Sequence, residues 1–245
     1  MPATSWHAVL DPKSRYLKAR NILTVLRDHG LASSDKVLDI GTGSGHIAGH
    51  IGAQQDSPDK VHSVDVRDLR VVKTDYIFHQ VTSAKLPFPD ESFRAVISNH
   101  TLEHLPDLSE QKLHLAECLR VLSKTGFLYL AVPNKYFVWE AHYRLPFLSW
   151  FPLAVASKVV RFFRLGTHYD CIPLSRHQLF RLLSEAGFAS ESMITRAVFS
   201  RLGLKADSGS RVRLGKFATG ISFFAIPTFQ VIARPADCSI AVAPD

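Results

Sequence analysis

The chain contains 245 residues, a length that a single α/β domain can fill. Its hydrophobic content of 46% is enough for a sizeable core and excludes global disorder. Lys and Arg number 29 against 22 Asp and Glu, which gives a formal net charge of +7. This excess suits nucleic acid, an anionic membrane or an acidic substrate, and does not choose among them.

The cysteines and the apolar stretches indicate in which cellular compartment the protein is expected. Cys118, Cys171 and Cys238 are too few for a disulfide scaffold in a chain of this length and predict reduced thiols in the cytoplasm. The first residues lack the basic and apolar regions of a signal peptide, so none is expected. The longest uncharged stretch, 217–233, contains several polar residues and falls short of the roughly 20 apolar residues that a spanning helix needs. Contact with a membrane surface stays open.

The hydrophobic pattern predicts strands that alternate with helices. A first helix over 13–29 is expected to end at Gly30. The next elements in chain order are a strand at 36–40, a helix at 46–54, strands at 61–66, 76–81 and 94–98, a helix at 108–123 and a strand at 126–132. The connection 67–75 is short for a crossover helix and is expected to be abbreviated. Beyond an insertion, the pattern predicts a helix at 174–187 and strands near 190–199 and 221–232, with a basic loop at 201–216.

This alternation is typical of a Rossmann-like, doubly wound α/β sheet with helices on both faces. Because no internal repeat or second domain boundary is evident, we expect a single domain over residues 1–245. Its expected parts are an N-terminal helix at 1–34, a core at 35–134, an insertion at 135–172, a C-terminal helix with strands at 173–234 and a tail at 235–245.

A glycine-rich loop follows the first predicted strand and opens the next helix. It spans 39–45, with the sequence D-I-G-T-G-S-G, so its backbone can approach a ligand closely and the helix adds N–H groups. The dinucleotide fingerprint G-x-G-x-x-G does not fit, because His46 occupies the position of its third glycine. Asp65, at the end of the second strand, can accept both hydroxyls of a ribose. These residues favour a nucleoside-bearing cofactor without a pyrophosphate over the alternative of a tight turn and a surface Asp.

Several sequence blocks carry a resemblance to a known family. They are the glycine loop, Asp65, L-P-F-P-D-E-S-F at 86–93, L-E-H-L-P-D at 102–107 and L-R-V-L at 119–122. In this order and spacing the chain resembles the class I S-adenosylmethionine-dependent methyltransferases, in particular the type 11 small-molecule group. The resemblance covers 36–134, with a weaker echo at 174–188. It implies a seven-stranded sheet, mostly parallel with an antiparallel last strand, and S-adenosyl-L-methionine as the cofactor.

The resemblance also implies roles for individual residues. The three glycines of the loop would pass beneath the methionine moiety while Asp39 orients the loop, and Asp65 would hold the ribose. Thr82 stands where the family often has an acid for the adenine, so that contact would come from Thr82, Ser83 or backbone. Asn99 would face the methionine portion and the methyl group. The implied cofactor-binding residues are Asp39, Gly41, Thr42, Gly43, Gly45, Asp65, Val66, Thr82, Ser83 and Asn99.

Residues 100–104, H-T-L-E-H, admit three interpretations. On a helix, H-x-x-E-H is the inverted zinc-peptidase motif, although the nearby Pro106 argues against it. Some members of the superfamily bind a divalent metal here through a carboxylate-x-x-Glu-His cluster, but His100 replaces the first carboxylate. In the plainest interpretation Glu103 starts a helix and His104 packs or forms a hydrogen bond. We expect no metal, and take His100 as general base for an acceptor hydroxyl with His104 as a second catalytic candidate.

The aromatic and basic insertion at 135–172 lies where this family carries its variable acceptor-binding elements. It is expected to form a lid, and its aromatic side chains beside Lys158, Arg161 and Arg164 also suit a lipophilic acceptor, a membrane-surface helix or a partner protein. The candidate acceptor-binding residues are His100, Glu140, His142 and Tyr143. Nucleic acid is disfavoured, because the positive charge is dispersed and no added binding domain is visible.

The sequence therefore predicts an enzyme that transfers a methyl group from S-adenosylmethionine to a small-molecule or lipid-linked acceptor. We expect it in the cytoplasm, with peripheral contact at the inner membrane surface left open. The alternatives are a metal-assisted methyltransferase or a zinc hydrolase that uses His100, Glu103 and His104, and a non-catalytic protein that binds the adenosyl cofactor. The sequence does not set the oligomeric state.

Overall fold

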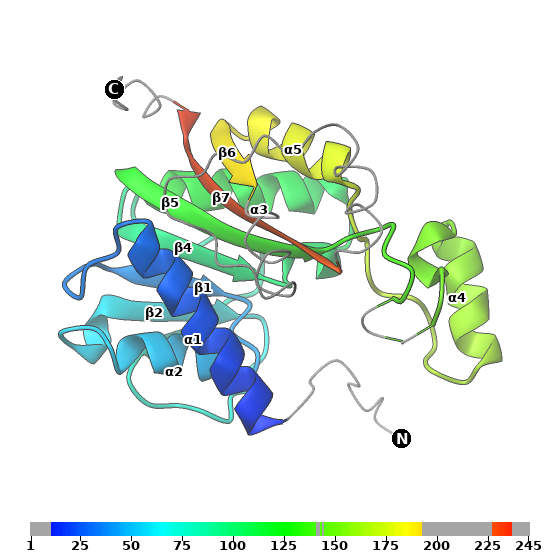
Figure 1. Ribbon diagram of the computed structural model, residues 1–245, viewed down its shortest axis with the longest axis horizontal. Helices are drawn as coiled ribbons and strands as arrows, with labels where there is room; N and C mark the ends of the chain where they lie inside the picture. Colours follow the sequence, from blue (N-terminus) through cyan, green and yellow to red (C-terminus); the bar gives the residue numbers. More distant parts are fainter. Residues whose placement is uncertain (1–10, 141–142, 144, 193–226, 237–245) are drawn as a thin grey trace, which may run out of the picture.

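A computed structural model describes residues 11–140, 143, 145–192 and 227–236, which are built around one seven-stranded sheet (Figure 1). The strand order is β3-β2-β1-β4-β5-β7-β6. The strands are β1 (Val37–Ile40), β2 (Val61–Asp65), β3 (Ile77–Gln80), β4 (Phe93–Asn99), β5 (Leu122–Pro133), β6 (Phe188–Ser192) and β7 (Thr228–Pro235). The helices are α1 (Pro12–Asp28), α2 (His46–Gly52), α3 (Leu108–Val121), α4 (Leu153–Phe162) and α5 (Arg176–Glu185), with short 3-10 turns η1 (Pro58–Lys60), η2 (Leu102–His104) and η3 (Leu148–Trp150).

The direction of the strands confirms the expected fold. Strands β3, β2, β1, β4 and β5 pair in parallel, whereas β7 is antiparallel to both β5 and β6. Every residue of β1 is buried, as expected for a parallel strand covered on both faces. Because β1, β2, β3 and β4 run the same way, they all end at one edge of the sheet, which we call the carboxyl edge.

Helices cover both faces of the sheet (Figure 1). One face packs under α1 and α2 in a core that includes Ile22, Ala48 and Phe127. The opposite face packs under α3 and α5 in a core that includes Leu115 and Leu182. Helix α4 lies apart from both layers, in a lobe beside the sheet (Figure 1). None of the described helices combines the length and the hydrophobicity that crossing a membrane requires.

The helix ends and one connection agree with local sequence signals. Helix α1 begins after Asp11, whose carboxylate accepts two backbone N–H groups, and it ends just before Gly30 as predicted. Helix α5 begins with a capping box between Ser175 and Gln178. The connection after β2 contains no helix, as expected, and the N–H groups of Val71 and Val72 both donate to the carbonyl of Ser44 at 3.0 Å.

Several predicted boundaries are wrong because strand pairing, which the hydrophobic period does not encode, decides them. Helix α3 stops at Val121, and β5 already begins at Leu122, which pairs with Phe93 across a register shift. Strand β6 begins at Phe188, where it pairs with Pro235 of β7. The remaining parts of the last two predicted strands, 193–199 and 221–226, lie outside the described residues, as does the predicted loop 201–216.

Arg120 joins two of the sequence blocks that carry the family resemblance. Its guanidinium donates to the carbonyls of Leu86 at 3.0 Å and Phe88 at 2.7 Å. It also pairs with Glu117 at 2.7 Å, and Glu117 accepts the N–H group of Leu86 at 2.8 Å. These blocks therefore fasten the segment before β4 to α3, and their part in the fold is structural.

We expect Arg120→Met to lower the free energy of unfolding by about 2–4 kcal/mol, because the Glu117 carboxylate and two carbonyls lose their donor. Urea unfolding followed by circular dichroism measures the change. Arg181→Met is the matched control, since Arg181 is exposed on α5 and pairs with Glu185. It should cost less than about 1 kcal/mol. Equal losses in the two variants would contradict a special role for Arg120.

Candidate functional site

The glycine loop between β1 and α2 is clamped from two sides. Gly41 has a φ of 74°, and a Cβ there would lie 2.2 Å from Oγ1 of Thr101, which follows β4. Gly45 has a φ of 80°, and a Cβ there would lie 2.2 Å from the carbonyl oxygen of Val72, in the connection after β2. Glycine is required at both positions, because the left-handed backbone and the close neighbours leave no room for a side chain.

Asp39 is a buried acid beneath this loop. Asp39 is only 1% exposed, and its Oδ2 has no hydrogen-bond partner among the described residues. Burial and, second, the negative charge of Asp65 raise the pKa of Asp39 from 3.8 to about 7. A buried carboxylate oxygen without a donor is costly, and such perturbed acids cluster at functional sites. The site therefore suits a ligand that brings a cationic or N–H group to Asp39.

Asp65 closes the other side of the loop from the end of β2. Its Oδ2 accepts the N–H group of Gly43 at 2.9 Å, and its Oδ1 accepts the N–H group of Arg67 at 3.2 Å. A carboxylate offers about four acceptor positions, so both oxygens retain capacity for ligand hydroxyls. The structure thus brings Asp39, Asp65 and the glycine loop together at the carboxyl edge.

The other predicted cofactor residues lie along the same edge. Thr42 is buried, with its hydroxyl 3.3 Å from the carbonyl oxygens of Asp39 and Val64. Val66 is exposed after β2, Thr82 and Ser83 are exposed beyond β3, and Asn99 is half-buried at the end of β4. These positions follow the ends of neighbouring strands, so one extended ligand can contact several of them.

His100 and Glu103 form a pair directly after β4. His100 has a φ of 56°, a conformation that is uncommon outside glycine and recurs at functional sites. Its Nδ1 lies 3.1 Å from Oε1 of Glu103, whose side chain is 1% exposed. Burial acts to raise the pKa of Glu103, but the hydrogen bond and the charge of His100 lower it overall. The ionised Glu103 therefore favours a proton on Nδ1 and leaves Nε2 as the acceptor.

His104 is separate from this pair. It is exposed at the end of η2, and its Nδ1 lies 3.8 Å from Sγ of Cys171. The expectation that Glu103 starts a helix is wrong, because the segment forms only the one-turn η2, and α3 begins after Pro106 at Leu108. The two histidines therefore do not share an α-helical face as the inverted zinc motif requires. Within the described ranges, no group of three or more His, Cys, Asp or Glu is arranged to hold a metal.

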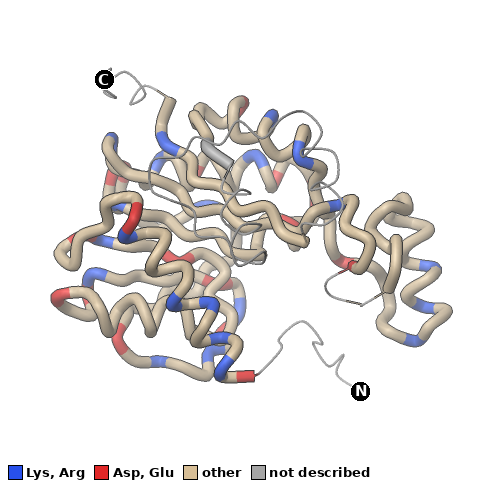
Figure 2. Tube along the Cα trace, in the orientation of Figure 1, with Lys and Arg blue, Asp and Glu red and all other residues tan. Residues whose placement is uncertain are grey.

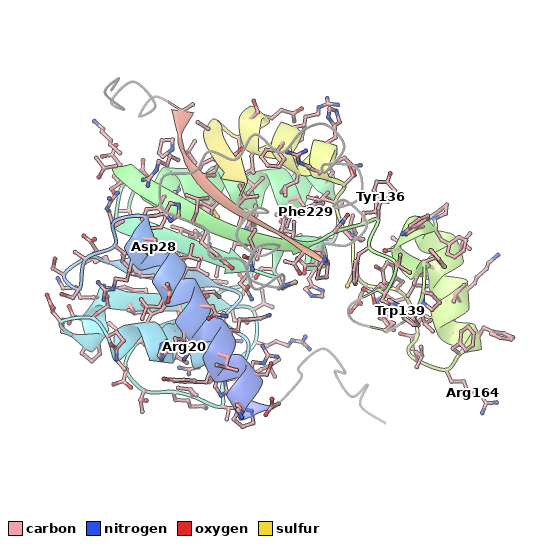
Figure 3. All side chains as sticks on the ribbon, viewed as in Figure 1. Arg20, Asp28, Tyr136, Trp139, Arg164 and Phe229 are labelled. Carbon is pink, nitrogen blue, oxygen red and sulfur yellow. The ribbon has the colours of Figure 1, made fainter. Side chains whose placement is uncertain are left out.

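The insertion expected to form a lid is a lobe that we call the α4 lobe, and it comprises the described residues 136–140, 143 and 145–172. Glu140 is buried, and its Oε2 accepts the N–H group of Tyr143 at 2.6 Å. The hydroxyl of Tyr143 donates to Asp170 at 3.0 Å. These predicted acceptor-binding side chains thus also hold the lobe together, while His142 lies outside the described residues. A shallow pocket at the junction with β5 is lined by residues that include Asn134, Glu140 and Trp139, and Trp139 is labelled in Figure 3.

Arg15 and Lys18 of α1, which the sequence analysis did not single out, also lie near the carboxyl edge. Burial and, second, the charge of Arg15 lower the pKa of His46 at the start of α2. Burial and the charge of Arg15 lower the pKa of Lys18, whereas the charge of Glu103 acts to raise it. The only sequence signal was a basic first helix, a common feature of solvated helix surfaces.

Comparison with known proteins identifies the family. Residues 12–192 match the model of a family described as a methyltransferase domain. This match covers more than half of the chain, and the chain belongs to that family. Membership confirms the predicted resemblance to class I methyltransferases, the predicted class of enzyme, and S-adenosylmethionine as the cofactor.

Individual relatives are more distant. The demethylmenaquinone methyltransferase of Chlorobaculum parvum is 26% identical over 165 residues, which cover 62% of this chain and 65% of that protein. The chain therefore spans less than two thirds of the length of this curated relative. The YcgJ protein of Bacillus subtilis has a TM-score of 0.52 at 18% identity, covering 87% of this chain and 97% of that one. A SAM-dependent methyltransferase of Archaeoglobus fulgidus has a TM-score of 0.54 at 15% identity, covering 89% and 93%. Both structures share the fold.

The raised pKa of Asp39 predicts a pH dependence of stability. In the unfolded chain the carboxyl loses its proton near its ordinary pKa of 3.8, whereas in the folded protein it keeps the proton up to about pH 7. The folded state binds more protons between these values, so stability falls as the pH rises through this window. Relative to Asp39→Asn, we expect the free energy of unfolding of the wild type to fall by about 3 kcal/mol from pH 4 to pH 7.

Urea unfolding of both proteins at a series of pH values measures this difference. Asp56→Asn, at an exposed aspartate, is the control and should follow the wild type across the same range. Parallel pH profiles for the wild type and Asp39→Asn would mean that the Asp39 carboxyl titrates normally in the folded protein.

Proposed function

We propose that this protein transfers the methyl group of S-adenosylmethionine to an apolar or lipid-linked small-molecule acceptor, as a member of the type 11 group. The observation that carries the proposal is the buried Asp39 oxygen, which has no hydrogen-bond donor in the described part of the chain. It lies beside Asp65 and beneath a loop that requires glycine at positions 41 and 45. The Chlorobaculum relative is named a demethylmenaquinone methyltransferase, which supports an acceptor of the quinone class. We also propose a cytoplasmic location.

The chain's residues fit the cofactor. Asp39 would accept the cationic amino group of the methionine moiety, which supplies the missing donor for Oδ2. Asp65 would accept the ribose hydroxyls with the capacity that its two backbone contacts leave. Thr82 and Ser83 would face the adenine, and Asn99 the methyl-bearing side. When bound, S-adenosylmethionine supplies a methyl group on a positively charged sulfur.

His100 is the proposed general base. Its Nε2 would accept the proton of the acceptor hydroxyl when the methyl group is transferred. Glu103 fixes the tautomer through Nδ1 and stabilises the resulting imidazolium. The remaining contribution of the protein is alignment and exclusion of water. Glu140, His142 and Tyr143 are proposed as contacts to the acceptor.

Cofactor binding is tested with Asp65→Ala. We expect its affinity for S-adenosylhomocysteine to fall by about 10- to 100-fold, because hydrogen bonds to a charged group are worth about 1.5–3 kcal/mol. Isothermal titration calorimetry measures the affinity. Asp56→Ala is the matched control and should bind as the wild type does. An unchanged affinity in Asp65→Ala would remove this carboxylate from the site, and no heat with the wild type would overturn the proposed function.

Catalysis is tested with His100→Asn, since asparagine tolerates the left-handed backbone but cannot act as the base. With reduced demethylmenaquinone as the first acceptor, we expect the rate of methyl transfer to fall by about 10²- to 10⁴-fold. Affinity for S-adenosylhomocysteine should not change. His177→Asn, at an exposed histidine of α5, is the control.

The outcomes separate the remaining candidates. Full activity in His100→Asn would show that transfer needs only alignment, and an equal loss in His104→Asn would make His104 a second catalytic residue. Binding of S-adenosylhomocysteine without transfer to any acceptor in a broad panel would identify a non-catalytic cofactor binder.

A further inference from the structure

Large apolar side chains are exposed along α4 and at the residue that follows it. The exposed fraction is 81% for Phe162, 55% for Phe163 and 42% for Val155. The two phenylalanine rings contact each other edge to face at 5.3 Å between centroids. Single exposed apolar residues are ordinary, but neighbouring aromatic rings at one helix end form a patch that needs a partner.

The rest of α4 explains why this patch stays outside. Ala156 and Val160 face inward and pack with Leu148, Tyr169 and Cys171 in a small core of the lobe's own. That core uses the inner face of the helix. Val155 and Phe162 are seven positions apart, so they share one stripe, which lies on the outer face. The core of the lobe therefore leaves the outer aromatic residues uncovered.

The charge around this patch is of one sign. Residues 153–169, which include α4, contain Lys158, Arg161 and Arg164 but no Asp or Glu. Figure 2 shows blue segments and no red along α4, and Figure 3 shows Arg164 pointing away from the sheet. In the part of the chain that the structure describes, no ion pair is found for Lys158, Arg161 or Arg164.

We propose that this α4 surface docks on an anionic lipid bilayer. The surface consists of Val155, Lys158, Arg161, Phe162, Phe163 and Arg164. The phenylalanines would enter the boundary between headgroups and acyl chains, while the Lys and Arg side chains reach the lipid phosphates. A second copy of the chain fits less well, because pairing two such surfaces would bring like charges together.

Docking would hold the carboxyl edge close to the bilayer. The lobe leaves the sheet after β5, and Asn134 bridges to Leu174 where the chain returns. The N–H group of Ile172 donates to the carbonyl of Glu103 at 2.7 Å. The returning segment therefore contacts η2, the turn that contains Glu103. An acceptor dissolved in the membrane would then reach the site without crossing water. This last step rests on the proposed function, whereas docking itself does not.

Vesicle sedimentation tests the proposal with the full chain. We expect binding to vesicles of phosphatidylcholine mixed with phosphatidylglycerol, and little binding to phosphatidylcholine alone. Phe162→Ser should weaken binding by about tenfold, the value of removing one buried aromatic side chain. Arg161→Gln should weaken it by about fivefold, since one basic residue at an anionic surface contributes about 1 kcal/mol. Raising NaCl to about 1 M should release the protein, because the Debye length falls to about 3 Å.

Matched variants distinguish this surface from general stickiness. Leu113→Ser and Arg181→Gln change exposed residues on α3 and α5 and should bind as the wild type does. No binding to anionic vesicles, or equal losses in the control variants, would overturn the proposal. So would self-association that Phe162→Ser abolishes, because a second copy would then cover the patch. None of these readouts depends on methyl transfer, so failure of the proposed reaction leaves the test intact.

Discussion

The constraint on which the rest of this molecule depends is a carboxylate placed where water does not reach it. Asp39 lies within β1, in which every residue is buried, and its Oδ2 has no donor among the described residues. Folding alone would favour an apolar side chain at such a position. The loop above it passes so close to Thr101 and Val72 that Gly41 and Gly45 leave no room for a side chain. The chain retains an unfavourable group at the point where three parallel strands end, which is the usual sign of a ligand.

The sequence features shared with the family divide into two kinds. Residues at the strand ends, such as Asp39, Asp65 and His100, present polar atoms to a common edge. Others, such as Arg120 and Glu117, satisfy backbone groups of the segment before β4 and never approach that edge. A motif that is specific for a family is therefore not by itself a list of catalytic groups. The two kinds differ in whether the side chain already forms hydrogen bonds to backbone groups of the fold.

Much of the fold was predictable, because alternating strands and helices with a glycine loop after the first strand leave few topologies. The meeting of Asp39 with Asp65 followed from the parallel direction of β1 and β2. Strand boundaries were not predictable, since Leu122 is a strand residue only through its pairing with Phe93. The pairing of His100 with Glu103 depends on the left-handed backbone at His100, which no sequence pattern specified. Nor did the sequence reveal that the Glu140 carboxylate accepts the backbone N–H group of Tyr143, because an exposed polar role suited Glu140 equally well.

The position of β7 has a consequence for how the molecule assembles. It comes last along the described chain, yet it lies between β5 and β6 and pairs with both. During synthesis β5 therefore waits with one side unpaired until residues 228–235 have left the ribosome. Such long-range closure slows folding and exposes an aggregation-prone edge meanwhile. A nascent chain halted before that point would present β5 to chaperones, whatever the state of its ligand site.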